Sequence, residues 1–275
     1  MPVTDIYFRN PAALPAMPEL ASRLLQSLGR DNVSLGEIAL LIERDASLAA
    51  KVLRFANSAR YSPQHDIASL RDAANMIGLR SLRDISLAAC LVSMFPPQAR
   101  FDRERFWRLG LATAGQARAL ATPCGLDPDT AYLAGLLLRT GFVLMLMTDP
   151  VRVSGCDAAA TVPDSLMDQE RAIFDCTHAE VSAVLARRWN FPAALSAALA
   201  AAADPAAAEP FSPLGALIRL ASAAAEAGDL LVPEVETLQS LHPALLARLG
   251  LDPAMLQATL LPYDLLTLGI DQLLV

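Results

Sequence analysis

The sequence is poor in charged and aromatic residues, and Lys51 is its single lysine. Charged residues make up 19% and aromatic residues 5% of the 275 positions, whereas hydrophobic residues reach 54%. This composition excludes a disordered chain and supplies enough apolar surface for a large core. Because few of the apolar residues are aromatic, most are alanine and leucine, which are strong helix formers. We therefore expect an all-α protein.

Membrane spans, leader segments and paired cysteines are also missing. The most apolar stretch, Tyr132 to Met147, is shorter than the roughly 20 residues that a span needs, and Arg139 lies within it. The N-terminus MPVTDIYFRN has neither the basic start nor the apolar run of a signal peptide. None of the four cysteines forms a C-x-x-C pair, so we expect small core residues in a reducing compartment. These absences predict a soluble, cytoplasmic protein with no membrane partner.

Basic residues are scarce in the last third of the chain. Residues 191–275 contain nine acids and two bases, so that the net charge of −7 lies there and residues 1–190 are neutral. An acidic chain has no field that attracts a phosphate backbone, and we do not expect nonspecific binding of nucleic acid.

Capping residues and helical spacing of apolar residues predict five short helices in the first hundred residues. Connections this short are typical of a helical bundle. The helices are expected to begin near Pro18, Ser34, Asp45, Ser69 and Ser81, with ends at Gly29, Asn57-Ser58, Gly78 and Pro96.

A second set of helices is expected over residues 102–203, with a loop at Thr148 to Pro163 that is rich in Asp, Pro, Gly and Ser. The helix over 127–147 is expected to kink near Gly141. The segment AAADPAAAEPFSP contains three prolines, and we place a boundary there. Residues 206–275 are then an acidic helical extension.

The motifs of catalytic chemistry are missing as well. No phosphate-binding glycine loop, nucleophile elbow or H-E-x-x-H pair occurs. His178 has Asp175 and Glu180 close in sequence, but on a helix Glu180 would point away from His178. We interpret His178 as a helix-start or core residue, His65 as a surface residue and His242 as a turn residue. Acid pairs such as Asp168 and Glu170 indicate a solvated face. We expect no cofactor and no metal.

One segment, residues 69–95, could form a helix–turn–helix around Gly78. Its second helix carries Arg80 and Arg83 but also Asp84. An ordinary helical hairpin explains the same pattern, because a helix that reads DNA usually has a net basic surface. A DNA-binding regulator that uses this hairpin stays an alternative.

Several short motifs together resemble the HDOD family, bacterial signalling proteins related to HD-domain phosphohydrolases. The resemblance covers residues 12–205, as an N-terminal lobe over 12–100 and an HD-like lobe over 101–205. It continues through HAEVSAVLARRWNFP, which contains His178 and Trp189. The matching N-terminal positions are Leu14-Pro15, Met17-Pro18, Asp45 with Leu48, Val52-Leu53-Arg54, Asn57-Ser58-Ala59, and Ala74 with Gly78.

The resemblance also marks where an HD hydrolase would need metal ligands. This chain has Leu109, Leu138-Arg139, Ala202 and Ala203 at those positions and keeps His178 alone. Leucine has no lone pair for a metal, and arginine brings positive charge to where a cation would sit. The resemblance therefore implies a non-catalytic regulatory protein of bacterial signal transduction that acts through contacts with unidentified signalling proteins. A metal-dependent phosphohydrolase with an atypical site stays an alternative, and a homodimer stays open.

Two positions allow sharper expectations. Asn57 and Ser58 are expected to bond to orphan carbonyls and to the neighbouring loop at the end of the third helix. Arg139 lies in the most apolar segment, where an unpaired charge is too costly. We expect it to fill the former metal position and to pair with an acid, with Asp175 and Glu180 as the candidates.

Overall fold

Helices supply all the regular structure in the part of the chain that the structure describes, which contains no strand. The computed structural model describes residues 3–9, 17, 19–26, 35–58, 67–95, 97–98 and 101–274. The all-α fold expected from the composition is confirmed. Outside these ranges lie Leu14, Pro15, Pro18, Gly29, Ser34, Ala59, His65 and Pro96.

The chain forms two compact units that are not continuous in sequence. Unit 1 comprises residues 1–14 and 97–266, and unit 2 comprises residues 15–96 and 267–275. The change of unit at 96–97 falls near the expected end of the N-terminal lobe. No change of unit occurs near 205, because the helices that follow the proline-rich segment belong to unit 1.

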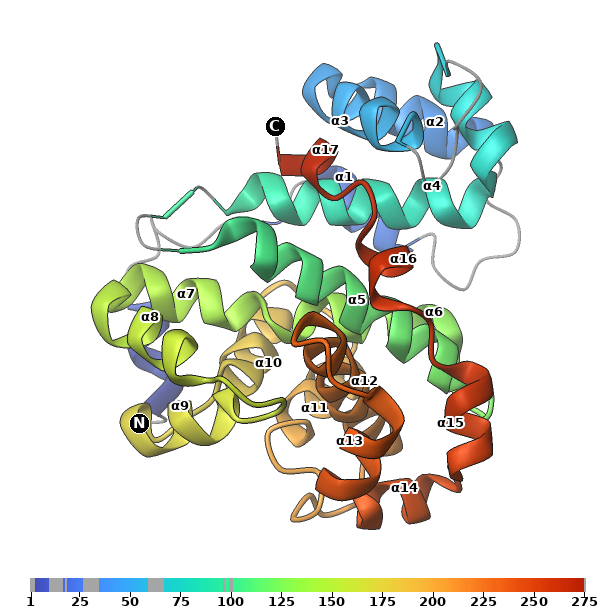
Figure 1. Ribbon diagram of the computed structural model, residues 1–275. Helices are drawn as coiled ribbons and strands as arrows, with labels where there is room; N and C mark the ends of the chain where they lie inside the picture. The colour runs from blue at the N-terminus through green and yellow to red at the C-terminus, as the bar shows by residue number, and fades with distance from the viewer. Residues whose placement is uncertain are drawn as a thin grey trace. The chain divides into compact units, whose positions relative to one another are not determined.

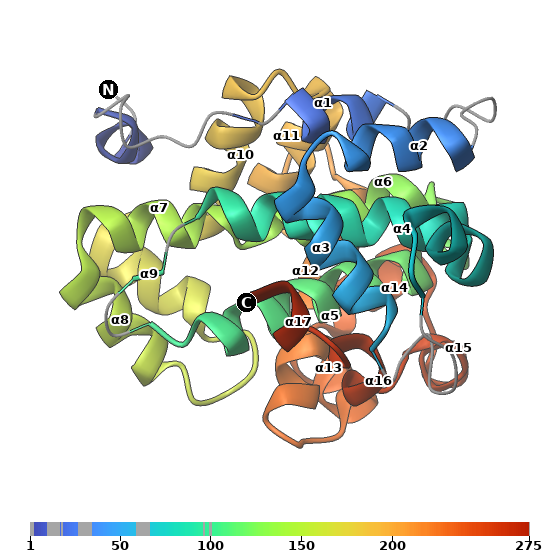
Figure 2. The ribbon, with the colours of Figure 1, turned by 90° about the horizontal axis from the view of Figure 1, so that it is seen from above.

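Unit 2 is built on two helices that the sequence marks clearly. Asp45 caps α3, since its Oδ1 accepts a hydrogen bond from the Leu48 backbone N at 3.0 Å. Within α4, Gly78 has φ +82°, a conformation that glycine adopts readily, so the two helices expected here meet at a bend. The helices of unit 2, shown in Figures 1 and 2, are α1 (Glu19–Gln26), α2 (Leu35–Glu43), α3 (Ala46–Ala56), α4 (Leu70–Met94) and α17 (Asp271–Leu274).

Unit 1 holds the remaining helices around a core centred on α5. Helix α5 packs against α6 and α12, and α10 packs against α7 and α11. The helices of unit 1 (Figure 1) begin with η1 (Val3–Phe8), α5 (Arg103–Ala121), α6 (Pro128–Leu138), α7 (Thr140–Thr148), α8 (Pro150–Ala159), α9 (Leu166–Phe174) and α10 (His178–Arg188). They continue with α11 (Ala193–Ala201), α12 (Pro213–Asp229), α13 (Glu234–Leu241), α14 (Pro243–Leu249), α15 (Pro253–Thr259) and α16 (Tyr263–Thr267), whose last residue belongs to unit 2.

The expected loop over Thr148 to Pro163 is wrong in its centre, because residues 150–159 form α8. The Asp149 carboxylate accepts a hydrogen bond from the Arg152 backbone N, and Pro150 occupies the first turn, where its missing N–H costs nothing. Val153 and Cys156 are buried and anchor the helix. Capping and burial thus outweigh the poor helix propensity of the residues between them.

The most apolar segment, Pro128–Thr148, is long enough to cross a membrane by length and composition. It is the one such stretch among the described residues, and 89% of its apolar window is buried inside the protein. Arg139 separates it into α6 and α7, close to the kink expected near Gly141. Its hydropathy therefore matches its place in the core of unit 1.

Candidate functional site

Arg139 is buried at the break between α6 and α7, with 4% of its surface exposed. Its Nη2 donates a hydrogen bond to Oε1 of Glu226 on α12. The same carboxylate accepts hydrogen bonds from Ser222 Oγ at 3.2 Å and from the Asp164 backbone N at 2.6 Å. A buried charge is tolerated when it is paired and hydrogen-bonded. The expectation that Arg139 pairs with an acid is confirmed.

The two acids expected to pair with Arg139 are engaged elsewhere, so that part of the expectation is wrong. Glu180 forms a capping box with Thr177 at the start of α10, and its Oε2 lies 2.8 Å from Arg171 Nη2. Asp175 follows α9 with φ +58° and ends that helix. Local helix capping therefore determines the role of each.

A second buried ion pair lies on α12, one turn before Ser222. Arg219 Nε lies 2.5 Å from Asp164 Oδ1, and both side chains are at most one-tenth exposed. Arg219 Nη1 also donates hydrogen bonds to the backbone oxygens of Ala202 and Ala203, each at 3.2 Å. The backbone carbonyls of Ala202 and Ala203 therefore bind the guanidinium of Arg219.

His242 joins this pair from the C-terminal side. It lies at the turn before α14, as expected, and its Nε2 is 2.8 Å from Asp164 Oδ2. The contact with Asp164 was not foreseeable from the sequence, because the two residues belong to distant segments.

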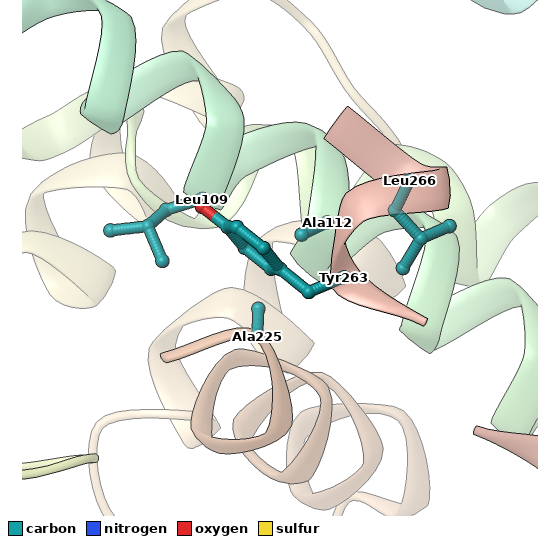
Figure 3. Packing of buried hydrophobic residues seen from close by; sticks show 5 residues of the cluster. All are labelled: Leu109, Ala112, Ala225, Tyr263 and Leu266. Atoms are coloured by element: carbon teal, nitrogen blue, oxygen red, sulfur yellow. The ribbon is translucent and has the colours of Figure 1, made fainter. Parts of the chain in front are cut away.

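Leu109 and Leu138 are core residues. Leu109 on α5 belongs to a buried cluster with Ala112, Ala225, Tyr263 and Leu266, drawn in Figure 3. Leu138 is fully buried at the end of α6, and its carbonyl accepts a hydrogen bond from Ser182 Oγ at 2.7 Å. Both side chains are hydrocarbon and offer no lone pair to a metal ion.

His178 opens α10 and is locked to Glu170 of α9. Its backbone N and its Nδ1 each lie 2.8 Å from Glu170 Oε2, and both side chains are buried. The ring also lies edge-on to Phe142, with centroids 6.4 Å apart. The helix-start interpretation of His178 is confirmed. The solvated-face interpretation holds for the exposed Asp168 but is wrong for Glu170, which has no exposed surface.

The residues at this centre do not fit the metal that HD hydrolases use. A metal site needs several converging ligands, and no group of three His, Cys, Asp or Glu side chains in the described part of the chain could hold an ion. Arg139 places a positive charge beside Leu138 and Leu109, and Glu226 is already neutralised by it. Among the described residues, the buried side-chain atoms without a hydrogen-bond partner include Arg139 Nε, His178 Nε2 and Glu170 Oε1.

A narrow cleft reaches Arg139 from the surface of unit 1. It is lined by Arg105, Leu109, Arg139, Asp157 and Glu226, among others, and has about 10 Å³ of free volume. That is space for about one water molecule, far below the several hundred Å³ of a pocket that encloses a substrate. Burial raises the pKa of the Asp157 carboxyl, although Arg139 and Arg105 act in the opposite direction.

The motif residues of unit 2 lie at the end of α3. Asn57 Oδ1 accepts a hydrogen bond from the Ile67 backbone N at 2.7 Å, and its Nδ2 donates to Ile67 O at 2.9 Å and Leu53 O at 3.1 Å. These bonds to a helix carbonyl and to the following segment are those expected for Asn57. The buried Ser58 Oγ has no hydrogen-bond partner in the part of the chain that the structure describes, so the expectation for Ser58 is wrong there.

The other motif positions have ordinary surroundings. Leu48 is buried in α3, Arg54 is exposed on the same helix, and Trp189 ends α10 with its ring centroid 6.3 Å from that of Phe191. None of these three adds a reactive group to the site.

The segment considered as a DNA-reading hairpin buries much of its second half. Arg80 is exposed, but Arg83 and Asp84 are 8% and 6% exposed, and every residue from Leu82 to Val92 is buried. A helix with so few exposed residues has little surface to insert into a groove of DNA.

The fold is all-helical, and unit 1 contains two buried arginine–carboxylate pairs, Arg139 with Glu226 and Arg219 with Asp164. The HDOD domain model matches residues 14–205, and the chain belongs to the HDOD family.

Solved structures share this fold over nearly the whole chain. One, from Shewanella amazonensis SB2B and named as a candidate phosphohydrolase, is 24% identical, covers 98% of both chains and has a TM-score of 0.76. Another, an HDOD domain protein with unknown function from Geobacter sulfurreducens, is 24% identical, covers 98% of this chain and 97% of its own, and has a TM-score of 0.75. At this identity the likeness shows the fold alone.

A curated relative is an uncharacterized protein of Treponema pallidum (strain Nichols). It is 29% identical over an alignment of 187 positions, which covers 64% of this chain. The match spans 35% of the length of that relative, which is therefore a much longer protein.

Proposed function

We propose that this protein is a non-catalytic regulator of bacterial signal transduction, located in the cytoplasm, that acts through contacts with other proteins. The observation that carries the proposal is the buried pair of Arg139 and Glu226, because the resemblance puts Arg139 at a position where an HD hydrolase would need a metal ligand. The guanidinium neutralises the Glu226 carboxylate, which is therefore not free to ligate an ion. A scaffold that keeps the helices without the ligands acts through its surfaces.

A second candidate, a metal-dependent phosphohydrolase with an atypical site, has one observation in its favour. His178 Nε2 and Glu170 Oε1 are buried without hydrogen-bond partners. Names of the structural neighbours divide between the two candidates, since one from Marinobacter aquaeolei VT8 is named for signal transduction. A fold likeness at 24% identity does not choose between them.

The decisive experiment measures metal content and hydrolysis together. The purified protein is dialysed against Mn²⁺, Fe²⁺ or Zn²⁺, desalted and analysed by elemental mass spectrometry, and then assayed with bis-p-nitrophenyl phosphate. We expect no stoichiometric metal and no turnover above a heat-denatured control. One or two tightly bound ions per chain, or a turnover that His178→Ala abolishes, would overturn the proposal in favour of the hydrolase.

A further inference from the structure

Leu231 has a backbone conformation that leucine rarely adopts. It follows the C-cap of α12 with φ +57°, in the left-handed region. The Leu231 N donates to Gly228 O at 3.2 Å, and the Val232 N donates to Ala227 O at 2.9 Å. This pair of bonds forms a Schellman motif, in which glycine or asparagine is strongly preferred at the left-handed position.

Three other helix ends in unit 1 repeat this bonding pattern with the preferred residues. After α10 the left-handed residue is Asn190, after α14 it is Gly250, and after α5 it is Gly125. Leucine at the same position costs free energy because its Cβ crowds the following carbonyl oxygen. The fold therefore gives no reason for leucine at position 231.

The side chain of Leu231 also gains nothing from packing, since 89% of its surface is exposed. The next residue, Val232, is 37% exposed. Strained and exposed apolar residues are typical of binding surfaces. An apolar side chain presented at the tip of a turn has the form of an anchor for another protein.

The surroundings of Leu231 indicate the charge of that partner. Leu230 and Val162 line the cleft that contains Asp157, and Val162 is 60% exposed. The nearest cation to the Asp157 carboxylate is Arg105 Nη1, at 3.9 Å, and no hydrogen bond to this carboxylate comes from the residues that the structure describes. Residues 220–247 contain no lysine or arginine, and two of their four acids, Glu226 and Asp229, are already paired with arginines. The other two, the partly exposed Glu234 and the exposed Glu236, follow Leu231 within five residues, so the surface beside Leu231 is complementary to positive charge.

We propose that Leu231, Val232, Val162 and the Asp157 carboxylate form a docking surface for a protein segment that presents a lysine or arginine beside apolar side chains. Leu231 packs against these apolar side chains, and the basic side chain reaches the Asp157 carboxylate in the cleft. This proposal rests on the proposed function, because it names the surface through which a non-catalytic regulator makes contact.

The test uses a phage-displayed library of random dodecapeptides as the probe. The full-length wild-type chain is panned, one enriched peptide is synthesised, and its affinity is measured for wild type, Leu231→Gly and Asp157→Asn. Ile173→Ala and Asp168→Asn serve as controls, since both alter exposed side chains of α9 in the same unit. Melting temperatures of all variants are recorded in parallel.

We expect peptides in which a basic residue adjoins apolar residues. Leu231→Gly should weaken binding about tenfold or more, as loss of an interface anchor does, yet raise the melting temperature by about 2–4 °C by relieving the left-handed leucine. Asp157→Asn should weaken binding and reduce its salt dependence, and the two controls should bind like wild type. A stabilised variant that binds less cannot be explained by misfolding.

The proposal is overturned if no peptide is enriched, if the enriched peptides lack basic residues, or if Leu231→Gly binds as tightly as wild type. A lower melting temperature of Leu231→Gly would overturn the argument from backbone conformation. These results would leave the metal and hydrolysis experiment unaffected, so the failure of the docking surface and of the non-catalytic assignment are distinguishable.

Discussion

Arg139 and Glu226 form a buried ion pair between residues 87 positions apart in the sequence. Arg139 lies within the range that matches the HDOD domain model, 14–205, and Glu226 lies outside it. The charge at the centre of the domain is therefore balanced by the segment that follows the domain. A chain truncated after residue 205 would lose the carboxylate that pairs with Arg139.

Replacing Arg139 by leucine tests the energetic weight of this pair. Arg139→Leu leaves Glu226 buried without a cation, and removal of one partner from a buried pair costs about 3–5 kcal/mol. Urea denaturation should show a loss of that size in the free energy of unfolding.

The double variant Arg139→Leu/Glu226→Leu is the matched control. With both charges removed it should be clearly more stable than Arg139→Leu, because no uncompensated charge remains. Equal stability of the two variants would show that Glu226 is not the partner that matters.

Asn57 is expected to stabilise unit 2 through its three hydrogen bonds to Ile67 and Leu53. Asn57→Ala removes them and should lower the free energy of unfolding by about 1–2 kcal/mol. Asn75→Ala, an exposed change on α4, should melt like wild type. If Asn57→Ala also melts like wild type, Asn57 serves a surface role instead.

Gly141 allows α7 to approach α10 closely. A Cβ at this position would collide with the backbone oxygen of His178 and with Ser182. Gly141→Ala should therefore destabilise the protein by about 3 kcal/mol or more. Gly155→Ala on α8 is the matched control, because nothing lies within 4 Å of the added carbon and alanine favours the helix by about 0.5–1 kcal/mol. Thermal melts that rank the two variants in the opposite order would contradict this close approach.

Burial of Cys90 makes stability sensitive to alkaline pH. Desolvation, with a smaller effect of the Asp45 charge, raises the pKa of the Cys90 thiol from 9.0 to about 12. Above pH 9 the unfolded chain releases this proton and the folded chain keeps it, so stability falls as the pH rises towards 12, by up to about 1.4 kcal/mol per unit.

The Cys90 effect is measured as the difference between wild type and Cys90→Ala in urea titrations at pH 8 to 11. The variant should lose less stability over this range, because it lacks the Cys90 thiol. It should still lose some stability, since other groups titrate in both proteins. Parallel curves for the two proteins would mean that Cys90 does not contribute.

Local signals were sufficient to predict much of the fold. Asp45 at the start of α3, Gly78 at the bend of α4 and Asn57 at the end of α3 act within a few residues of their own positions. Helix capping and backbone conformation depend on residues that are near in sequence, so these features can be predicted without knowledge of the fold. The helix α8 is not predicted, because its segment is rich in residues that are typical of turns, although Asp149 caps its first turn.

Tertiary pairing could not be derived in this way. The sequence indicates that Arg139 needs an acid, but not that Glu226 would supply it from α12. In the sequence, Glu170 looks like one of a pair of acids on a solvated helix face. Only the approach of α9 to α10 brings its carboxylate to His178. The pairing of His242 with Asp164 depends likewise on contacts between distant segments.

Unit 2 contains a helix, α17, from the far end of the chain. Lys51 Nζ donates a hydrogen bond to the Leu273 carbonyl oxygen at 3.3 Å, and Leu273 is fully buried. During synthesis on a ribosome, residues 15–96 emerge long before Leu273 does, so this unit cannot be completed when its first helices appear. The order of translation and the order of assembly therefore differ. The apolar surface that α17 covers in unit 2 stays exposed until residues 267–274 have emerged.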